Sequence, residues 1–120
     1  MFFSSIRNNL INNKSTNISG DEAYELISNN SNILILDIRN FDEFSYGHIP
    51  KAKNIPASEL MYRINEIKDY SSLPVIVYCA SGNRSSIAVN ILLKNNFTNI
   101  FNLYRGLKDW KYQIEYTAGF

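Results

Sequence analysis

Hydrophobic residues form two short, nearly uninterrupted runs in this chain. The first is NILILDI, Asn32 to Ile38, and the second is VIVY, Val75 to Tyr78, which follows Pro74. Neither run alternates apolar with polar residues, so we predict two strands that are covered on both faces. A third, shorter strand is predicted from Asn99 to Leu103. Strands covered on both faces are typical of a parallel sheet.

Segments with helical periodicity lie between these runs. Ser19 and Glu22 have the spacing of a capping box, and a helix with one apolar face is predicted over residues 21–27. The stretch Ser58 to Lys68 is amphipathic, with Leu60, Met61, Ile64 and Ile67 on one face. Three more helical segments are predicted: Phe41 to Tyr46, stopped by Gly47; Arg84 to Asn95; and a final turn around Trp110. Strands that alternate with helices predict an α/β domain with right-handed crossovers.

The length of 120 residues suits one compact domain, and 45% hydrophobic with 19% charged residues is an ordinary globular balance. Residues 1–17 are rich in Asn and weakly periodic, so we interpret them as a loosely held arm or a short docking helix. The domain is then expected over residues 18–120. The opening residues lack the apolar stretch of a secretory signal, and no run approaches the ~18 apolar residues of a membrane span.

Charge and cysteine content narrow the class of function. A formal net charge of +1 gives no field that favours nucleic acid or an acidic membrane surface, so neither is expected as a partner. One cysteine cannot form an internal disulfide, which favours a reducing, cytoplasmic setting. One Cys and one His are also too few for a typical metal site, and we expect no metal and no cofactor.

The single cysteine, Cys79, lies where the second buried strand turns into a helix. The loop from Cys79 to Arg84 is made largely of small or turn-tolerant residues, and backbone N–H groups at such a helix start can converge on an anion. Gly82 allows the loop to fold back, and Arg84 adds a permanent positive charge. A thiolate in this position should have a pKa below the ~8.5 of a free thiol. The pattern predicts nucleophilic catalysis by Cys79 on a small anionic group.

Each candidate residue also has a structural interpretation. A lone cysteine is often a small buried hydrophobe, and Arg84 could anchor the loop to a carboxylate. We favour structural roles for Asp37, as an acceptor for loop amides, and for Arg39, as a partner of Glu43. A thiolate held by amides needs no base, so the only histidine, His48, is expected to be a hydrogen-bonded turn residue, and Trp110 a packing residue.

Several separated motifs between Ile18 and Trp110 resemble those of the rhodanese-like sulfurtransferases. ILILDIR resembles the first signature of that family, and the acidic Glu43 with GHIPKAKNIP resembles its GHIPGA(x)NIP segment. YCASGNRS resembles the Cys-x-x-Gly-x-Arg-Ser active loop, and YRGLKDW resembles the closing L-x-G-G-x-x-x-W stretch. One departure concerns backbone shape more than chemistry: Lys51 stands where the family often has Gly.

The resemblance implies a rhodanese-like three-layer α/β fold with a small, mainly parallel sheet flanked by helices. It also implies that the cysteine takes a sulfane sulfur from thiosulfate or a persulfide donor, carries it as a persulfide and passes it to a thiophilic acceptor. A sulfur-donor or acceptor protein is a possible partner, and a monomer or weak dimer is expected. The implied site has Cys79 and Arg84 as catalytic residues; Ala80, Ser81, Gly82, Asn83 and Ser85 as the substrate-binding loop; and Asp37, Arg39 and Glu43 in support.

Two other classes of function stay open at this point. Phosphatases and arsenate reductases also place Cys and Arg around an anion-binding loop, commonly with five residues between them. Here four residues separate Cys79 from Arg84, and a smaller ring of amides suits one sulfur atom better than a phosphoryl group. A non-enzymatic persulfide carrier or binding module is the second alternative, although modules of that kind usually lack the cysteine.

Overall fold

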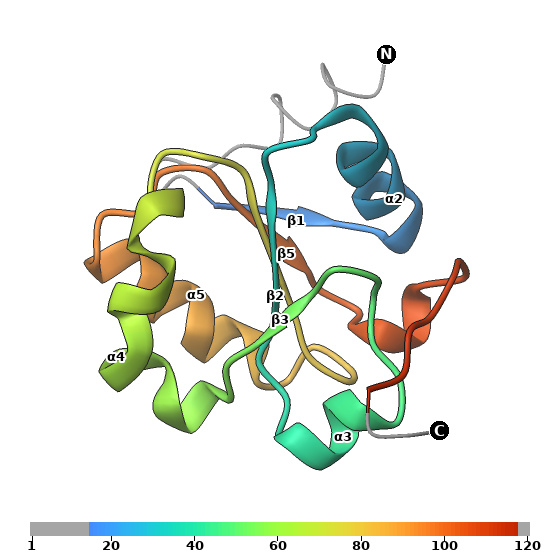
Figure 1. The fold of residues 1–120 in the computed structure, drawn as a ribbon. Coiled ribbons are helices and arrows are strands. Elements are labelled where there is room, and N and C mark those ends of the chain that lie inside the picture. The colour runs from blue at the N-terminus through green and yellow to red at the C-terminus, as the bar shows by residue number, and fades with distance from the viewer. Residues whose placement is uncertain (1–14, 118–120) are drawn as a thin grey trace.

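A computed structural model describes residues 15–117 of the chain and has a five-stranded sheet at its centre (Figure 1). The strand order is β1-β5-β4-β2-β3, and every pair of neighbouring strands is parallel. The strands are β1 (Ser15–Ile18), β2 (Leu34–Asp37), β3 (Lys53–Asn54), β4 (Val75–Tyr78) and β5 (Ile100–Leu103). The three strands predicted from apolar runs are β2, β4 and β5, which lie side by side in the middle of the sheet.

Helical segments connect the strands and cover both faces of the sheet (Figure 1). The α-helices are α2 (Gly20–Asn29), α3 (Phe41–Ser45), α4 (Leu60–Arg63) and α5 (Ser85–Lys94), and the 3₁₀ helices are η1 (Ala57–Glu59), η2 (Ile64–Tyr70) and η3 (Leu107–Asp109). None of the helices within residues 15–117 is long and apolar enough to span a membrane.

Two hydrophobic clusters, one on each face of the sheet, make the domain three layers thick. Side chains alternate between the faces along each strand, so Leu36 lies in one cluster and Ile35 in the other. The first cluster joins the sheet to α5 and to the segment from η1 to η2, while the second joins it to α2 and to Trp110. The structure thus confirms the predicted three-layer α/β fold, with helices flanking a small parallel sheet.

The first strand of the sheet includes residues that the sequence analysis assigned to the N-terminal arm. Residues 15–17, which the sequence assigned to the arm, belong with Ile18 to β1, whose four residues pair in parallel with β5. This strand is short and at the edge of the sheet, with Thr16 and Ile18 buried and Asn17 exposed, so it lacks the apolar run of a central strand. Residues 1–14, to which the rest of that interpretation applies, lie outside the described part of the chain.

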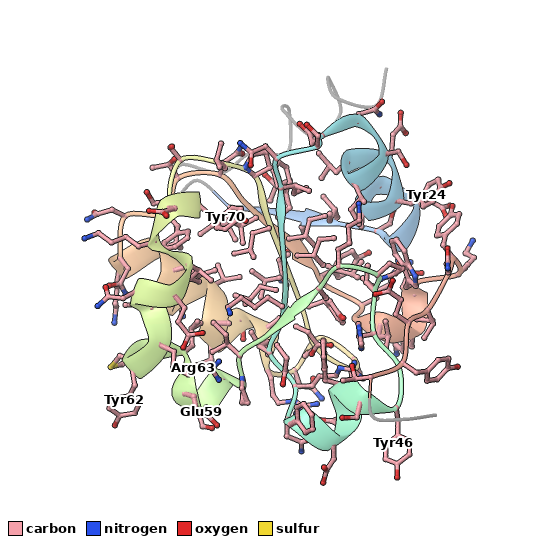
Figure 2. All side chains as sticks on the ribbon, in the orientation of Figure 1. Tyr24, Tyr46, Glu59, Tyr62, Arg63 and Tyr70 are labelled. Atoms are coloured by element: carbon pink, nitrogen blue, oxygen red, sulfur yellow. The ribbon has the colours of Figure 1, made fainter. Side chains whose placement is uncertain are left out.

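The amphipathic segment from residue 58 to 68 is helical but is not one regular helix. It is divided among η1, α4 and η2, and this change of helical pitch rotates the predicted apolar face. Leu60 and Ile67 are fully buried as expected, whereas Met61 is 65% exposed. The neighbouring Tyr62 points away from the molecule in Figure 2 and is 87% exposed. The prediction that Met61 faces the core is therefore wrong.

The N-terminus of α2 confirms the capping box that the sequence predicts. The Glu22 amide donates to Ser19 Oγ at 3.2 Å, and the Ser19 amide donates to Glu22 Oε1 at 2.8 Å. These two bonds satisfy amide groups that the first turn of a helix leaves without an intrahelical partner.

We expect Ser19→Ala to lower the free energy of unfolding by about 1 kcal/mol, because the Glu22 amide loses its acceptor. Ser28→Ala is the matched control, since it removes an exposed hydroxyl that bonds the Tyr24 carbonyl within the same helix. Urea denaturation of the two variants measures the difference. Equal losses of stability in both would contradict the role of Ser19 as a cap.

Candidate active site

Cys79 directly follows β4 and opens the loop that leads into α5 (residues 85–94). The carboxyl ends of parallel strands β2 and β4 lie at the same edge of the sheet, so this loop sits beside the residues that follow Asp37. Cys79 is 1% exposed, and its Sγ accepts a hydrogen bond from the Gly82 amide at 3.0 Å. The loop therefore folds back over the sulfur, as the sequence predicted.

The loop amides control the acidity of the Cys79 thiol. Burial raises its pKa, but hydrogen bonds from the backbone amides of Arg84, Gly82, Ser85 and Ser81 outweigh burial and leave the pKa below its ordinary value. These amides favour the thiolate because they point toward the place where its negative charge develops. A lowered pKa raises the fraction of the thiol that is present as thiolate, the form in which a cysteine acts as a nucleophile.

Gly82 and Gly106 allow two backbone segments to approach each other closely. Gly82 has φ +97°, and a Cβ there would clash with the carbonyl of Tyr104. Gly106 has φ +76°, and a Cβ there would clash with the backbone of Ala80. The Leu107 amide also donates to the Cys79 carbonyl at 2.8 Å. The segment that follows β5 (residues 100–103) therefore supports the active loop from behind.

The remaining loop residues differ in their surroundings. Ser85 is fully buried, and its hydroxyl donates to the Gly82 carbonyl at 3.2 Å, which ties the first turn of α5 to the loop. Asn83 and Ser81 contact each other, Nδ2 to Oγ at 3.5 Å, on the exposed side of the loop. We therefore place Ser85 in a supporting position and Ser81 and Asn83 at the outer surface of the loop.

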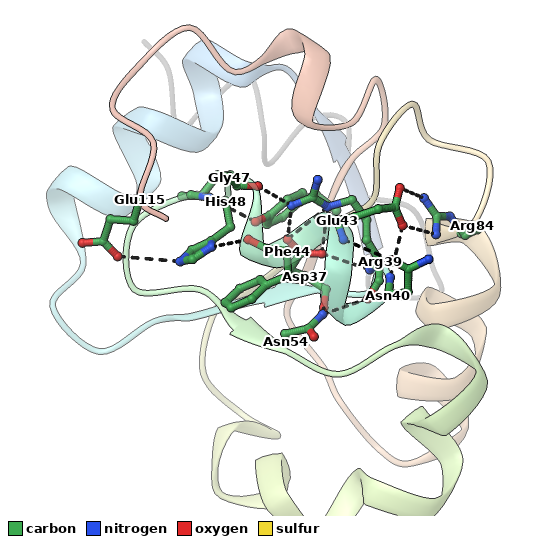
Figure 3. Close-up of polar contacts among 12 residues, drawn as sticks. Asp37, Arg39, Asn40, Glu43, Phe44, Gly47, His48, Asn54, Arg84 and Glu115 are labelled. Carbon is green, nitrogen blue, oxygen red and sulfur yellow. Dashed lines mark hydrogen bonds and ion pairs between the residues drawn. The ribbon is translucent and has the colours of Figure 1, made fainter. Parts of the chain in front are cut away.

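Arg84 makes a two-pronged ion pair with Glu43, which lies on α3 (Figure 3). Its two terminal nitrogens donate to the Glu43 oxygens at 2.8 and 2.9 Å. The guanidinium holds the pKa of Glu43 below its ordinary value. Glu43 also caps α3, because its Oε1 accepts from the Asn40 amide at 3.1 Å. The carboxylate anchor that the sequence analysis gave as the structural interpretation of Arg84 is thus present.

Asp37 and Arg39 form a buried ion pair at the carboxyl end of β2 (Figure 3). The Arg39 guanidinium donates to Asp37 at 2.7 Å and to the Gly47 carbonyl at 2.6 Å. Asp37 also accepts the Arg39 backbone amide at 2.9 Å. The prediction that Arg39 pairs with Glu43 is therefore wrong. Arg39 pairs with Asp37, which lies two positions earlier in the chain, and Glu43 pairs with Arg84.

His48 is a hydrogen-bonded turn residue, as expected. Its Nδ1 lies 2.7 Å from the Phe44 carbonyl, and its ring stacks on the Phe44 ring with centroids 3.7 Å apart. The backbone of His48 pairs with that of Glu115 in an isolated antiparallel β-bridge, which joins the turn after α3 to the C-terminal segment. These contacts account for His48 without a role as a base for Cys79.

Sequence reasoning missed two residues that hold the site together. Asn54 donates from Nδ2 to the carbonyls of Asp37 and Arg39 at 3.0 and 2.8 Å, which fixes the chain as it leaves β2. Tyr78 is fully buried, and its hydroxyl accepts from the Ile49 amide at 3.1 Å. The sequence offered one signal for Tyr78, because a polar aromatic residue ends an otherwise apolar strand. No sequence pattern identified Asn54.

Among residues 15–117, no group of three or more His, Cys, Asp or Glu side chains is placed to hold a metal ion. The described residues offer a thiol surrounded by backbone amides that lower its pKa, while the guanidinium groups of Arg39 and Arg84 are each paired with a carboxylate.

We expect Asp37→Asn to lower the free energy of unfolding by about 3 kcal/mol, because it leaves the Arg39 charge buried without its counter-ion. Glu66→Gln is the matched control, since it removes an exposed carboxylate that pairs with Arg63 and Lys53. That control should leave stability nearly unchanged, because solvent screens an exposed pair. Chemical denaturation tests both; similar losses would mean that burial of the first pair is unimportant.

We also expect the rate of Cys79 alkylation by iodoacetamide to rise with pH with a midpoint clearly below ~8.5, the pKa of a free thiol. The same titration on urea-unfolded protein is the control, because unfolding removes the amides. Arg84→Gln should shift the midpoint less than unfolding does, since the Arg84 backbone amide is kept. A native midpoint at or above that of the unfolded protein would disprove the electrostatic effect of the loop.

The chain is similar to known proteins in its sequence and in its fold. The rhodanese-like domain family matches residues 19–113. The "uncharacterized protein YqhL" of Bacillus subtilis is 43% identical over 81 residues, which are 68% of this chain and 63% of YqhL. A sulfurtransferase of Allochromatium vinosum is 31% identical over 94 residues, which are 78% of this chain and 85% of that protein.

A crystal structure of thiosulfate sulfurtransferase from Pseudomonas aeruginosa has the same fold, with a TM-score of 0.75 and 30% identity over 85% of this chain and 20% of that one. The chain spans less than two thirds of the length of several curated relatives that it matches. The names of relatives support sulfur transfer in general. By its sequence and by its fold, the chain belongs to the rhodanese-like domain family.

Proposed function

We propose that this protein is a rhodanese-type sulfurtransferase that moves a sulfane sulfur from thiosulfate or a persulfide donor to a thiophilic acceptor through a persulfide on Cys79. The convergence of the loop amides on Cys79 Sγ supports this reaction most directly. A group of donors around one sulfur atom suits a nucleophile that must carry negative charge before and after it receives a second sulfur.

In the first half-reaction, the Cys79 thiolate attacks the outer sulfur of thiosulfate. A bond forms between the two sulfurs, the sulfur–sulfur bond of thiosulfate breaks, and sulfite leaves with the electron pair of that bond. With a persulfide donor the same attack releases a thiolate instead of sulfite. The total charge is unchanged in either case, and no oxidant or reductant is consumed.

In the second half-reaction, an acceptor attacks the outer sulfur of the Cys79 persulfide. Cyanide becomes thiocyanate, or a thiolate becomes a persulfide, and the electron pair of the broken bond returns to Cys79 Sγ as thiolate. The amides of Ser81, Gly82, Arg84 and Ser85 serve both states, because the charge stays within the same small loop. Gly82 keeps that loop tight, since its backbone lies against Tyr104.

The size of the loop favours sulfur over phosphate. Four residues separate Cys79 from Arg84, and the amide of Gly82 lies within hydrogen-bonding distance of the sulfur itself. The Arg84 guanidinium is taken by Glu43, whereas a phosphatase needs an arginine free to bind phosphoryl oxygens. A donor or acceptor protein fits the proposed reaction equally well, because the chemistry at Cys79 is the same for a persulfide carried by a protein.

We expect the intact mass of the protein to rise by one sulfur atom after incubation with excess thiosulfate. Peptide mapping should place this sulfur on Cys79, and cyanide or a thiol should remove it. Cys79→Ser is the control, because a hydroxyl of similar size stays protonated and should take up no sulfur while the fold, followed by circular dichroism, is kept.

Other outcomes would support other functions. Sulfur uptake or transfer by Cys79→Ser would disprove the proposed mechanism. Turnover of an aryl phosphate without any gain of sulfur would favour the phosphatase alternative. If the protein neither gained sulfur, from thiosulfate or from a small-molecule persulfide, nor released phosphate, a binding module that has kept its cysteine would be the better description.

A further inference from the structure

The two guanidinium groups of the site already have carboxylate partners. Arg84 is held by both oxygens of Glu43, and Arg39 is buried against Asp37. An anionic donor that approached Arg84 would have to displace Glu43, at distances of 2.8 and 2.9 Å. Thiosulfate carries two negative charges and has to approach a thiolate, so a nearby cation that is not neutralised in this way would favour its binding.

Arg105 is such a cation, and its backbone lies against the active loop. It follows β5 (residues 100–103), and a Cβ on Gly82 would lie 3.9 Å from Arg105 Cα. The side chain is exposed and, within the described residues, forms no ion pair. Its guanidinium sits over the ring of Tyr104, 5.0 Å from the ring centroid. Contact with the ring restricts the positions that the guanidinium can take, while the N–H groups of the guanidinium stay available for a ligand.

We propose that Arg105 binds the anionic end of the sulfur donor, the sulfonate-like oxygens of thiosulfate, at the outer side of the active loop. This inference rests on the proposed function. A planar guanidinium can donate two N–H groups to two oxygens of such a group, while the outer sulfur is directed to Cys79. The sulfite that leaves keeps those oxygens, so Arg105 also stabilises the charge that grows on the leaving group.

Lys108 is the neighbouring cation that could be confused with Arg105. It is exposed, and its backbone amide donates to the Ala80 carbonyl at 3.4 Å. Its ammonium is a point charge that lacks the paired donors of a guanidinium. Lys94 ends α5 (residues 85–94), about 15 Å along the helix from the loop, and so offers a distant control with the same change of charge.

The test is the steady-state KM for thiosulfate with cyanide as the acceptor. Arg105→Gln should raise KM about fivefold, the upper end of the effect of losing a solvent-exposed charge pair, and Arg105→Lys should recover part of the loss because it restores the charge. The pH midpoint of Cys79 alkylation should not move, because the loop amides are unchanged. Lys108→Gln should have a smaller effect than Arg105→Gln, and Lys94→Gln should have none. An unchanged KM in Arg105→Gln, or an equal rise in all three, would overturn the assignment.

Thiosulfate binding to Cys79→Ser protein, followed by calorimetry, separates this inference from the proposed function. In that background, Arg105→Gln should weaken binding by the same factor. Binding that depends on Arg105 without sulfur uptake by the native protein would contradict the sulfurtransferase reaction but keep the anion site. If the native protein takes up sulfur but Arg105→Gln leaves thiosulfate binding unchanged, the result would support the sulfurtransferase reaction and contradict the anion site at Arg105.

Discussion

The backbone amides of one short loop must converge on a single sulfur atom, and the rest of the site depends on this constraint. Gly82 has a φ of +97°, a conformation that glycine adopts without steric cost, and this turn lets the loop direct its amides inward. The same turn brings Gly82 against Tyr104, and Gly106 then leaves room for Ala80. Two glycines far apart in the sequence therefore produce one feature, a thiol whose pKa is lowered despite its burial.

Because peptide dipoles stabilise the thiolate, the charged side chains around it are available for structural roles. Arg39 with Asp37 fixes the chain as it leaves β2, and Arg84 with Glu43 joins the start of α5 to α3. In the reaction proposed above, the loop would hold the reacting sulfur, and the exposed Arg105 would bind the donor.

The central part of the fold could be predicted from the sequence, and its edges could not. Strands β2, β4 and β5 are covered on both faces, so each appears as an apolar run. Edge strands β1 and β3 are two to four residues long and partly polar, and only their pairing with a neighbour defines them. The change of helical pitch between residues 58 and 68 could not be predicted from the sequence either. A periodicity of 3.6 residues placed Met61 in the core, but the segment contains 3₁₀ turns.

In the site, the sequence predicted contacts between residues that are close in the chain, but it did not predict which charged side chains from distant segments form ion pairs. The loop after Cys79 is contiguous, whereas the ion pair of Glu43 and Arg84 spans 41 positions. Lys51 illustrates a third case, because its φ of +70° is the left-handed conformation that the usual Gly would adopt without the cost of about 1 kcal/mol. Its amide donates to Glu115 Oε1 at 3.2 Å, and the backbone of Glu115 pairs with that of His48. The C-terminal segment thus holds the strained turn in place, and through the neighbouring Gly47 carbonyl it supports Arg39.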